Sequence, residues 1–159
     1  MINRREFGMV VTAAALLAAG PTRAQDETIL TLIMGDAAME YTLSDLRAMD
    51  ATTFETTTIW TEGMQQFTGI SLHALIEQSG AEGSFFAATA VNDYSIEIPV
   101  SDAIPGGPII AYERNGETMS LRDKGPLWIV YPYDSNSEYQ SEVSYSRSIW
   151  QLERLELLP

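Results

Sequence analysis

From Ile29 onward, the sequence alternates short runs of strand-forming residues with turn signals. The strand-like runs cover residues 29–34, 54–60, 85–91, 94–100, 109–114, 118–121, 127–131 and 148–157. Helical spacing of apolar residues occurs in only two short segments, residues 42–46 and 69–80. We therefore expect about six or seven strands and two short helices, without internal repeats or a linker. This pattern is typical of a single α+β domain with a mixed β-sheet and a barrel-like core.

Three sites within this pattern carry more specific signals. Residues 127–131 (LWIVY) are uniformly apolar, which is typical of a strand buried on both faces of its sheet. The pairs at 92–93 (ND) and 115–116 (NG) each separate two strand-like runs. Asn, Asp and Gly are the residues that tight turns between antiparallel strands prefer. We therefore expect a β-hairpin around each of the two turns.

The first 24 residues have the features of an export signal. A pair of arginines precedes an apolar run of 13 residues, GMVVTAAALLAAG at 8–20, and TRA at 22–24 then offers small residues for a cleavage site. The run is shorter than the roughly 20 residues that span a bilayer, so we expect a removed signal peptide over 1–24. NRREF at 3–7 also resembles a twin-arginine motif, which leaves the export route open.

A cleaved chain of residues 25–159 keeps 6 basic and 21 acidic residues, a formal charge of −15. This acidity excludes nucleic-acid binding, because proteins of that class neutralise phosphates with clustered Lys and Arg. The sequence has no cysteine, so disulfides, thiolate metal ligands, iron–sulfur clusters and cysteine nucleophiles are excluded as well. We expect a periplasmic protein whose fold is stabilised by its hydrophobic core alone.

The other residue types that perform catalysis or bind metals are few or scattered. His73 is the only histidine, and one histidine supplies neither a metal cluster nor, without a Gly-x-Ser-x-Gly motif, a serine hydrolase. Asp134, Glu138 and Glu142 offer oxygen ligands for calcium, but they lack the regular Asp-x-Asp-x-Asp spacing, which favours a solvated acidic loop. The sequence therefore predicts neither a metal site nor a catalytic residue.

An aromatic segment between Gly125 and Trp150 is the strongest signal for a ligand. It reads GPLWIVYPYDSNSEYQSEVSYSRSIW and contains four tyrosines and one cation, Arg147. A buried strand that leads into a polar, tyrosine-rich loop brings aromatic faces to the rim of the core, where they can stack flat heterocycles. The same composition also fits a core strand followed by an ordinary solvated loop, so the residues alone leave both interpretations open.

The order of motifs along the chain resembles a known family. The chain presents, in order, TLSDL, TTTIW, FTGISLHALIEQSG, VNDYSIEIPV, PIIAYERNGETM, KGPLWIVYP and RSIWQLERLEL. These phrases are similar to the Trp-x-Gly-Val-x-Leu helix start, the Asp-Gly-Tyr turn, the Leu-Ala-Tyr…Asn-Gly-Glu hairpin and the Gly-x-Pro-x-Arg strand of the oxidoreductase molybdopterin-binding domain family. The resemblance covers about residues 28–157. It implies a sulfite-oxidase fold and a pterin- or molybdopterin-binding domain over 25–159.

Departures from the family pattern bear on function. Enzymes of this fold bind molybdenum through a cysteine after a strand that corresponds to about residues 56–61, where this chain has TTTIWT. The arginine of the Gly-x-Pro-x-Arg phrase falls on Trp128. Molybdopterin also carries a phosphate that needs a cationic cradle, which we expect six cations on a −15 chain to assemble poorly. The resemblance therefore favours the short, exported, cysteine-poor branch of this fold, whose members bind pterins.

The resemblance also suggests the ligand-binding residues. A reduced pterin needs aromatic stacking and a carboxylate or amide opposite its 2-amino-pyrimidinone edge. The candidates are Trp60, Asn92, Asp93, Tyr94, Tyr131, Asp134 and Arg147. Each candidate also has a structural alternative. In that alternative, Trp60 and Tyr131 are core residues and residues 92–93 form an ordinary turn. Arg147 then pairs with a nearby acid, and Asp134 stabilises the loop that follows Pro132.

Three functions follow as hypotheses. The leading hypothesis is a periplasmic, non-catalytic pterin-binding protein that serves as a sensor subunit for a membrane-bound signalling protein. The second is a molybdopterin-dependent oxidoreductase that holds its cofactor without the cysteine ligand. The third is a ligand-free module that a protein partner recruits through its acidic surface.

Overall fold

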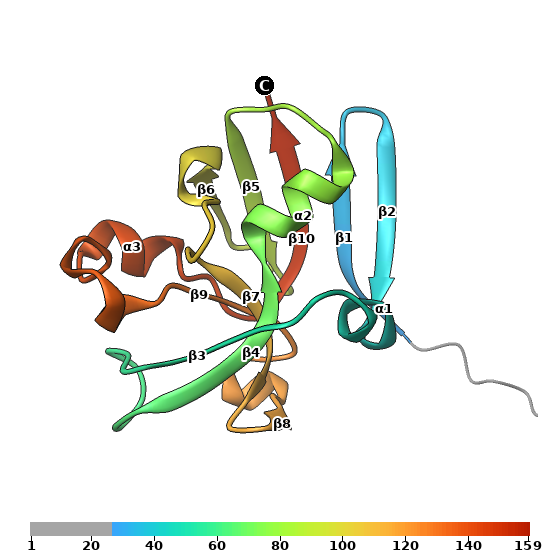
Figure 1. Ribbon diagram of the computed structural model, residues 1–159. Helices are drawn as coiled ribbons and strands as arrows, with labels where there is room; N and C mark the ends of the chain where they lie inside the picture. Colours follow the sequence, from blue (N-terminus) through green and yellow to red (C-terminus); the bar gives the residue numbers. More distant parts are fainter. Residues whose placement is uncertain (1–26) are drawn as a thin grey trace, which may run out of the picture.

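The computed structural model describes residues 27–159, in which ten strands form two sheets with short helices at their ends and faces (Figure 1). The predicted signal peptide, residues 1–24, lies outside the described residues. The prediction of one α+β domain with mixed sheets and few short helices is confirmed. Each sheet keeps free edge strands, so the strand order is that of two open sheets and not of one closed barrel.

The first sheet has the strand order β2-β1-β10-β5-β6. Its strands are β1 (Thr28–Met34), β2 (Ala37–Thr42), β5 (Phe85–Ala90), β6 (Ser95–Pro99) and β10 (Leu152–Leu158). β1 and β10 pair in parallel and the other neighbours are antiparallel, which makes this sheet mixed. Leu30 and Leu32 of β1 are fully buried and alternate with more exposed residues, so one face of the sheet packs on the core.

The second sheet is antiparallel and has the order β3-β4-β7, with β8 and β9 both pairing along the other edge of β7. Its strands are β3 (Thr52–Thr56), β4 (Gln65–Ser71), β7 (Ile109–Arg114), β8 (Glu117–Thr118) and β9 (Trp128–Val130). All of β9 is buried, which confirms the buried strand expected from the uniformly apolar run.

The segment that precedes β10 links the two sheets. The Ile129 N–H of β9 donates to the Ile149 carbonyl at 2.9 Å, and Trp128 forms an isolated β-bridge with Trp150. Gln151 then adopts a left-handed conformation with φ of 53°, after which the chain enters the first sheet as β10. This crossing places Trp150 at the junction between the sheets.

The α-helices of the described chain are α1 (Leu43–Ala48), α2 (Leu72–Ser79) and α3 (Glu142–Arg147). Thr42 and Asp45 form a capping box at the start of α1. Ser71 caps the start of α2, and Gly80 ends it in the left-handed conformation. Single 3-10 turns occur at η1 (Val100–Asp102), η2 (Leu121–Asp123), η3 (Tyr133–Ser135) and η4 (Ser137–Tyr139). None of the helices in residues 27–159 has the length and apolarity needed to span a membrane.

Most local predictions are confirmed, and the exceptions lie next to the site. Both predicted hairpins and both predicted helices are present, at β5–β6, β7–β8, α1 and α2. The second helix starts at Leu72, because residues 69–71, which were expected to open it, are the end of β4. The strand predicted over 54–60 is wrong beyond Thr56, where β3 ends and a loop begins. The closing strand starts at Leu152 and not at 148, because the preceding residue is left-handed. β2, β4 and α3 were not predicted, since their apolar residues follow neither period cleanly.

Candidate functional site

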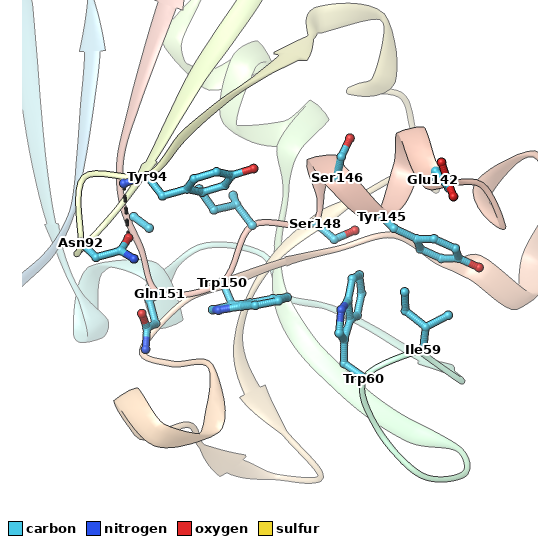
Figure 2. A pocket seen from close by; sticks show the side chains of 12 residues that line it. Ile59, Trp60, Asn92, Tyr94, Glu142, Tyr145, Ser146, Ser148, Trp150 and Gln151 are labelled. Carbon is cyan, nitrogen blue, oxygen red and sulfur yellow. Dashed lines mark hydrogen bonds between the residues drawn. The ribbon is translucent and has the colours of Figure 1, made fainter.

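A cavity lies where the loop after β3, the β5–β6 turn and the segment from α3 to β10 meet. Its volume is about 580 Å³, within the range of small-molecule sites. The lining residues are Ile59, Trp60, Ala90, Asn92, Tyr94, Glu142, Tyr145, Ser146, Ser148, Ile149, Trp150 and Gln151. Figure 2 shows Tyr94, Trp150, Trp60 and Tyr145 in an arc, with the amides of Asn92 and Gln151 at one end and Glu142 at the other.

Trp60 is the centre of the aromatic wall. Its ring contacts those of Trp150, Tyr145, Trp128 and Tyr133 at centroid distances of 5.6, 5.7, 5.8 and 6.2 Å. All four contacts are edge-to-face, an arrangement that aromatic pairs prefer. The indole is therefore packed against rings around it while one side remains open to the cavity.

Asp134 fixes the loop that carries Trp60. Its carboxylate accepts from the Thr57 backbone N–H at 2.6 Å and from the Thr57 hydroxyl at 2.8 Å. The Asp134 N–H in turn donates to Thr56 Oγ1 at 3.1 Å. These bonds turn the chain away from β4 after Thr56, which explains why the predicted strand ends early. The Thr57 N–H and hydroxyl also hold the pKa of Asp134 below its ordinary value.

This brace predicts a pH-dependent contribution to stability. Because its pKa is lowered on folding, Asp134 stabilises the folded state above its ordinary pKa, and this contribution is lost as pH falls through the lowered value. We expect Asp134→Asn to lower the free energy of unfolding by about 1 kcal/mol near neutral pH, since the group is exposed, and by less in acid. Urea unfolding at several pH values measures this, with exposed Glu138→Gln as the control. A deficit that grows in acid would contradict the assignment.

The polar groups of the cavity are two amides, a few hydroxyls and one carboxylate. Asn92 Oδ1 accepts from the Tyr94 N–H at 3.3 Å, which leaves its NH₂ group available to a ligand. Gln151 donates to the Leu121 carbonyl at 2.7 Å, which leaves its own carbonyl available. Glu142 is the single charged residue among those that line the cavity. The cavity therefore suits a flat heterocycle that presents N–H donors at one edge.

The structure divides the residues predicted from the sequence. Trp60, Asn92 and Tyr94 line the main cavity together. Asp93 lies in the same turn with φ of 68° but is not among the lining residues. Asp134 lines a separate hollow of about 230 Å³ behind Trp60's loop, where its carboxylate is already bound to Thr57.

Tyr131 and Arg147 meet at Asp102, outside the cavity lining. The Tyr131 side chain is buried, and its hydroxyl donates to Asp102 Oδ2 at 2.7 Å. Arg147 Nη1 donates to the same oxygen at 2.9 Å. Burial raises the pKa of the Tyr131 hydroxyl, and its hydrogen bond to Asp102 adds to the effect. This arrangement matches the structural alternatives for both residues, a core tyrosine and an ion-paired arginine.

A cationic hollow of about 400 Å³ lies on the other side of Trp60. It is lined by Trp60, Thr61, Glu62, Gln65, Arg114, Arg122, Asp123 and Lys124. Three of the six cations of residues 25–159 are thus gathered here, and none of the three forms an ion pair within residues 27–159. Lys124 Nζ lies 4.7 Å from the centroid of the Trp150 ring, a cation–π contact. Glu62 and Asp123 also line the hollow, so its formal charge is +1, and the expectation that the chain assembles a cationic cradle poorly stays a prediction.

Sequence reasoning missed Glu142, Tyr145 and Trp150 as members of the cavity wall. The first two belong to α3, which is capped by Ser141, whose hydroxyl accepts from the Ser144 N–H. A serine cap followed by residues spaced three apart was the available signal, and it places Glu142 and Tyr145 on one helix face. In residues 27–159, no group of three or more His, Cys, Asp or Glu side chains is placed to hold a metal ion.

Comparisons with known proteins bear on the fold. No family model matches the chain, and no curated protein matches it. Among solved structures, the sulfane dehydrogenase SoxCD from Paracoccus pantotrophus is similar, with a TM-score of 0.61 and 16% sequence identity. The match covers 96% of this chain and 56% of that chain, so this chain spans little more than half of its neighbour's length. The fold is sulfite-oxidase-like.

At 16% identity, the similarity to SoxCD shows the fold alone. It supports the sulfite-oxidase-like fold that the motifs of the sequence implied, and nothing finer. The cavity of this chain is lined by an aromatic wall and by a single carboxylate, Glu142, at one end.

Proposed function

We propose that this protein binds a pterin, or a close relative with the same 2-amino-pyrimidinone edge, and does not transform it. The proposal rests on the cavity of about 580 Å³, in which Trp60, Trp150 and Tyr145 form an aromatic wall beside one carboxylate, Glu142. Aromatic faces stack a flat bicyclic ring, and a carboxylate accepts from two parallel N–H donors at the ring's edge. A pterin offers both features through its ring and its 2-amino and N3–H groups.

The polar ends of the cavity suggest how the ligand lies. With its donor edge at Glu142, the ring extends along Trp60 and Trp150 toward Asn92 and Gln151 (Figure 2). The Asn92 NH₂ group and the Gln151 carbonyl are then placed to bind the polar substituents of the second ring. The three predicted residues Trp60, Asn92 and Tyr94 keep their proposed role as lining residues. Glu142, which was not among the predicted residues, supplies the carboxylate in this proposal.

Molybdopterin fits this chain only in part. Its metal has no thiolate ligand here, since the chain lacks cysteine and the loop after β3 presents Trp60 instead. For its phosphate, Arg114, Arg122 and Lys124 line the hollow next to Trp60, together with the two acids Glu62 and Asp123. This hollow favours, as a second candidate, a pterin with an anionic tail, including molybdopterin held without a thiolate. No catalytic step is assigned to it.

The proposed place of work is the periplasm, and the proposed partner is a membrane-bound signalling protein that senses the occupied cavity. The export signal predicted over residues 1–24 supports the first, and the aromatic wall of the cavity supports a binding role. The acidic surface also supports the rival role of a ligand-free interaction module. Ligand titration separates these two roles.

Calorimetric titration with 6-methyltetrahydropterin tests the proposal. The matched pair of oxidised rings is pterin and lumazine, since lumazine replaces the 2-amino group by a carbonyl while it keeps the flat ring and N3–H. It loses one of the two donors to Glu142, so we expect it to bind more weakly than pterin. Glu142→Gln should remove most of this preference, at a cost of about 1.5–3 kcal/mol for the charge-assisted hydrogen bonds. The matched control is Glu138→Gln, which makes the same change at an exposed carboxylate on η4. Equal affinities for both rings, or no binding of either, would contradict the proposal.

The cationic hollow gives a separate prediction for a phosphorylated ligand. A pterin that carries a phosphate monoester should bind more tightly than its dephosphorylated form, and added salt should reduce the difference. We expect Arg122→Gln to remove about 1 kcal/mol of this difference, since the hollow is open to solvent. Arg154→Gln on β10 removes an equal charge outside the hollow and serves as the control. An equal loss in both variants would show a non-specific charge effect.

A further inference from the structure

A row of aromatic rings leads from the cavity wall into the core. Trp60 contacts Tyr133 with 6.2 Å between ring centroids, and Tyr133 contacts Tyr131 at 6.3 Å. Tyr145 provides a second connection, at 5.7 Å from Trp60 and 5.6 Å from Tyr133. Tyr133 and Tyr131 are only 2% and 1% exposed. The row therefore begins at a surface that a ligand can touch and reaches Tyr131 inside the protein, where the ring of the partly buried Tyr139 lies 5.5 Å beyond it.

The inner end of the row has a proton acceptor. The Tyr131 hydroxyl donates to Asp102 Oδ2 at 2.7 Å, the oxygen that also accepts from Arg147 Nη1 at 2.9 Å. The Asp102 side chain is 20% exposed, so a proton received there has a route to solvent. Tyr133 instead shares its hydrogen bond with the Ser148 hydroxyl, which is a poor base. Among the tyrosine hydroxyls of residues 27–159 that form hydrogen bonds, that of Tyr131 alone donates to a carboxylate.

This acceptor determines which side chain is finally oxidised when the row loses one electron. Tryptophan and tyrosine are the side chains that lose one electron most readily, and an oxidised tyrosine is stable only when its proton leaves as well. Burial raises the pKa of the Tyr131 hydroxyl, so the proton stays on the phenol until an electron is removed. Removal of the electron from Tyr131 is then coupled to proton transfer along an existing hydrogen bond of 2.7 Å.

We propose that this row is a one-electron relay, which carries an oxidising equivalent from the cavity to Tyr131. A one-electron-oxidised aromatic heterocycle in the cavity takes one electron from Trp60. The Trp60 radical cation then takes one electron from Tyr131 across the Tyr133 ring, while the Tyr131 proton moves to Asp102 Oδ2. The products are the ligand reduced by one electron, neutral Trp60, a neutral Tyr131 radical and a protonated Asp102. The relay thus moves oxidising power away from a bound ligand.

The relay goes beyond the proposed function, because it requires an oxidant in contact with Trp60 but not a pterin. Its test therefore uses the protein without ligand, and its failure is distinct from a failure of pterin binding. Tris(bipyridine)ruthenium(II) with persulfate, activated by a light flash, supplies a one-electron oxidant. Rapid freezing and electron paramagnetic resonance then measure the tyrosyl radical and its lifetime.

We expect a long-lived neutral tyrosyl signal that is lost in Tyr131→Phe. Asp102→Asn keeps Tyr131 and every ring but removes the base, so it should also abolish the long-lived signal. Tyr112→Phe removes another buried tyrosine, which lies on β7 outside the row, and should leave the signal unchanged. An undiminished signal in Tyr131→Phe, or an equal loss in Tyr112→Phe, would overturn the relay. Circular dichroism of each variant checks that it is folded.

Discussion

Trp60→Ala is expected to weaken pterin binding by about 1–3 kcal/mol, a roughly 5- to 150-fold rise in Kd. The reason is its position, since Trp60 contacts four other rings and forms the middle of the cavity wall. Removal of the indole deletes the stacking face and also leaves Trp150 and Tyr145 without their common neighbour. Calorimetric titration with 6-methyltetrahydropterin measures the change.

Controls separate this binding effect from a general loss of structure. Trp60 is only partly buried, so Trp60→Ala should remain folded, with a lower thermal midpoint. Trp60→Phe keeps an aromatic face and should retain most of the affinity. Tyr41→Ala removes a partly buried aromatic side chain on β2, outside the cavity, and should not change binding. An affinity that falls as much in Tyr41→Ala as in Trp60→Ala would contradict the assignment.

Gly69→Ala is expected to destabilise the protein by about 3 kcal/mol or more, the upper end for overpacked positions. A Cβ atom at Gly69 would lie 2.0 Å from the Ile110 carbonyl oxygen and 2.6 Å from the Ala111 Cα of the neighbouring strand. Both are backbone atoms, which cannot move aside as a flexible side chain can. The pairing of β4 with β7 also shifts register between Thr68 and Gly69, so the two backbones approach closely there.

Urea unfolding gives the size of this effect. Thr68→Ala, the preceding residue on β4, removes a half-buried side chain that shares a hydrogen bond of 2.9 Å with Thr53. It should cost about 1 kcal/mol or less, because the bond is exposed to solvent. A loss in Gly69→Ala no larger than in Thr68→Ala would show that the two strands can separate to admit a methyl group.

Local signals explain which parts of the fold were predictable from the sequence. The turns of both hairpins place residues in left-handed conformations, with φ of 68° at Asp93, 54° at Asn115 and 80° at Gly116. Asn, Asp and Gly tolerate this region, so the sequence identifies the turns directly. The caps of α2, Ser71 and Gly80, are likewise read from neighbouring residues.

Long-range partners explain what the sequence did not reveal. Asp134 binds Thr57, 77 positions away, and Arg147 binds Asp102, 45 positions away. Neither spacing has a local signature, so Asp134 and Arg147 were predicted to bind the ligand although their side chains are engaged within the protein. Glu142 reaches the cavity only because α3 forms beside Tyr145, in a segment that lacked a clear helical period.

The amino-acid composition also did not reveal how the charges are distributed on the folded chain. A net charge of −15 over residues 25–159 argues against a cationic site when charges are only counted. Folding nevertheless brings Arg114, at the end of β7, beside Arg122 and Lys124, which follow β8. A local hollow can thus oppose the net charge, because short-range groups dominate the field at a site.

Native mass spectrometry of the protein recovered from the periplasm of a molybdenum-cofactor-producing host tests the central claim most directly. The account predicts a folded chain that carries one small organic molecule without molybdenum, and fragmentation of that molecule should give a pterin ring. A bare chain, or a chain whose adduct contains molybdenum, would contradict it.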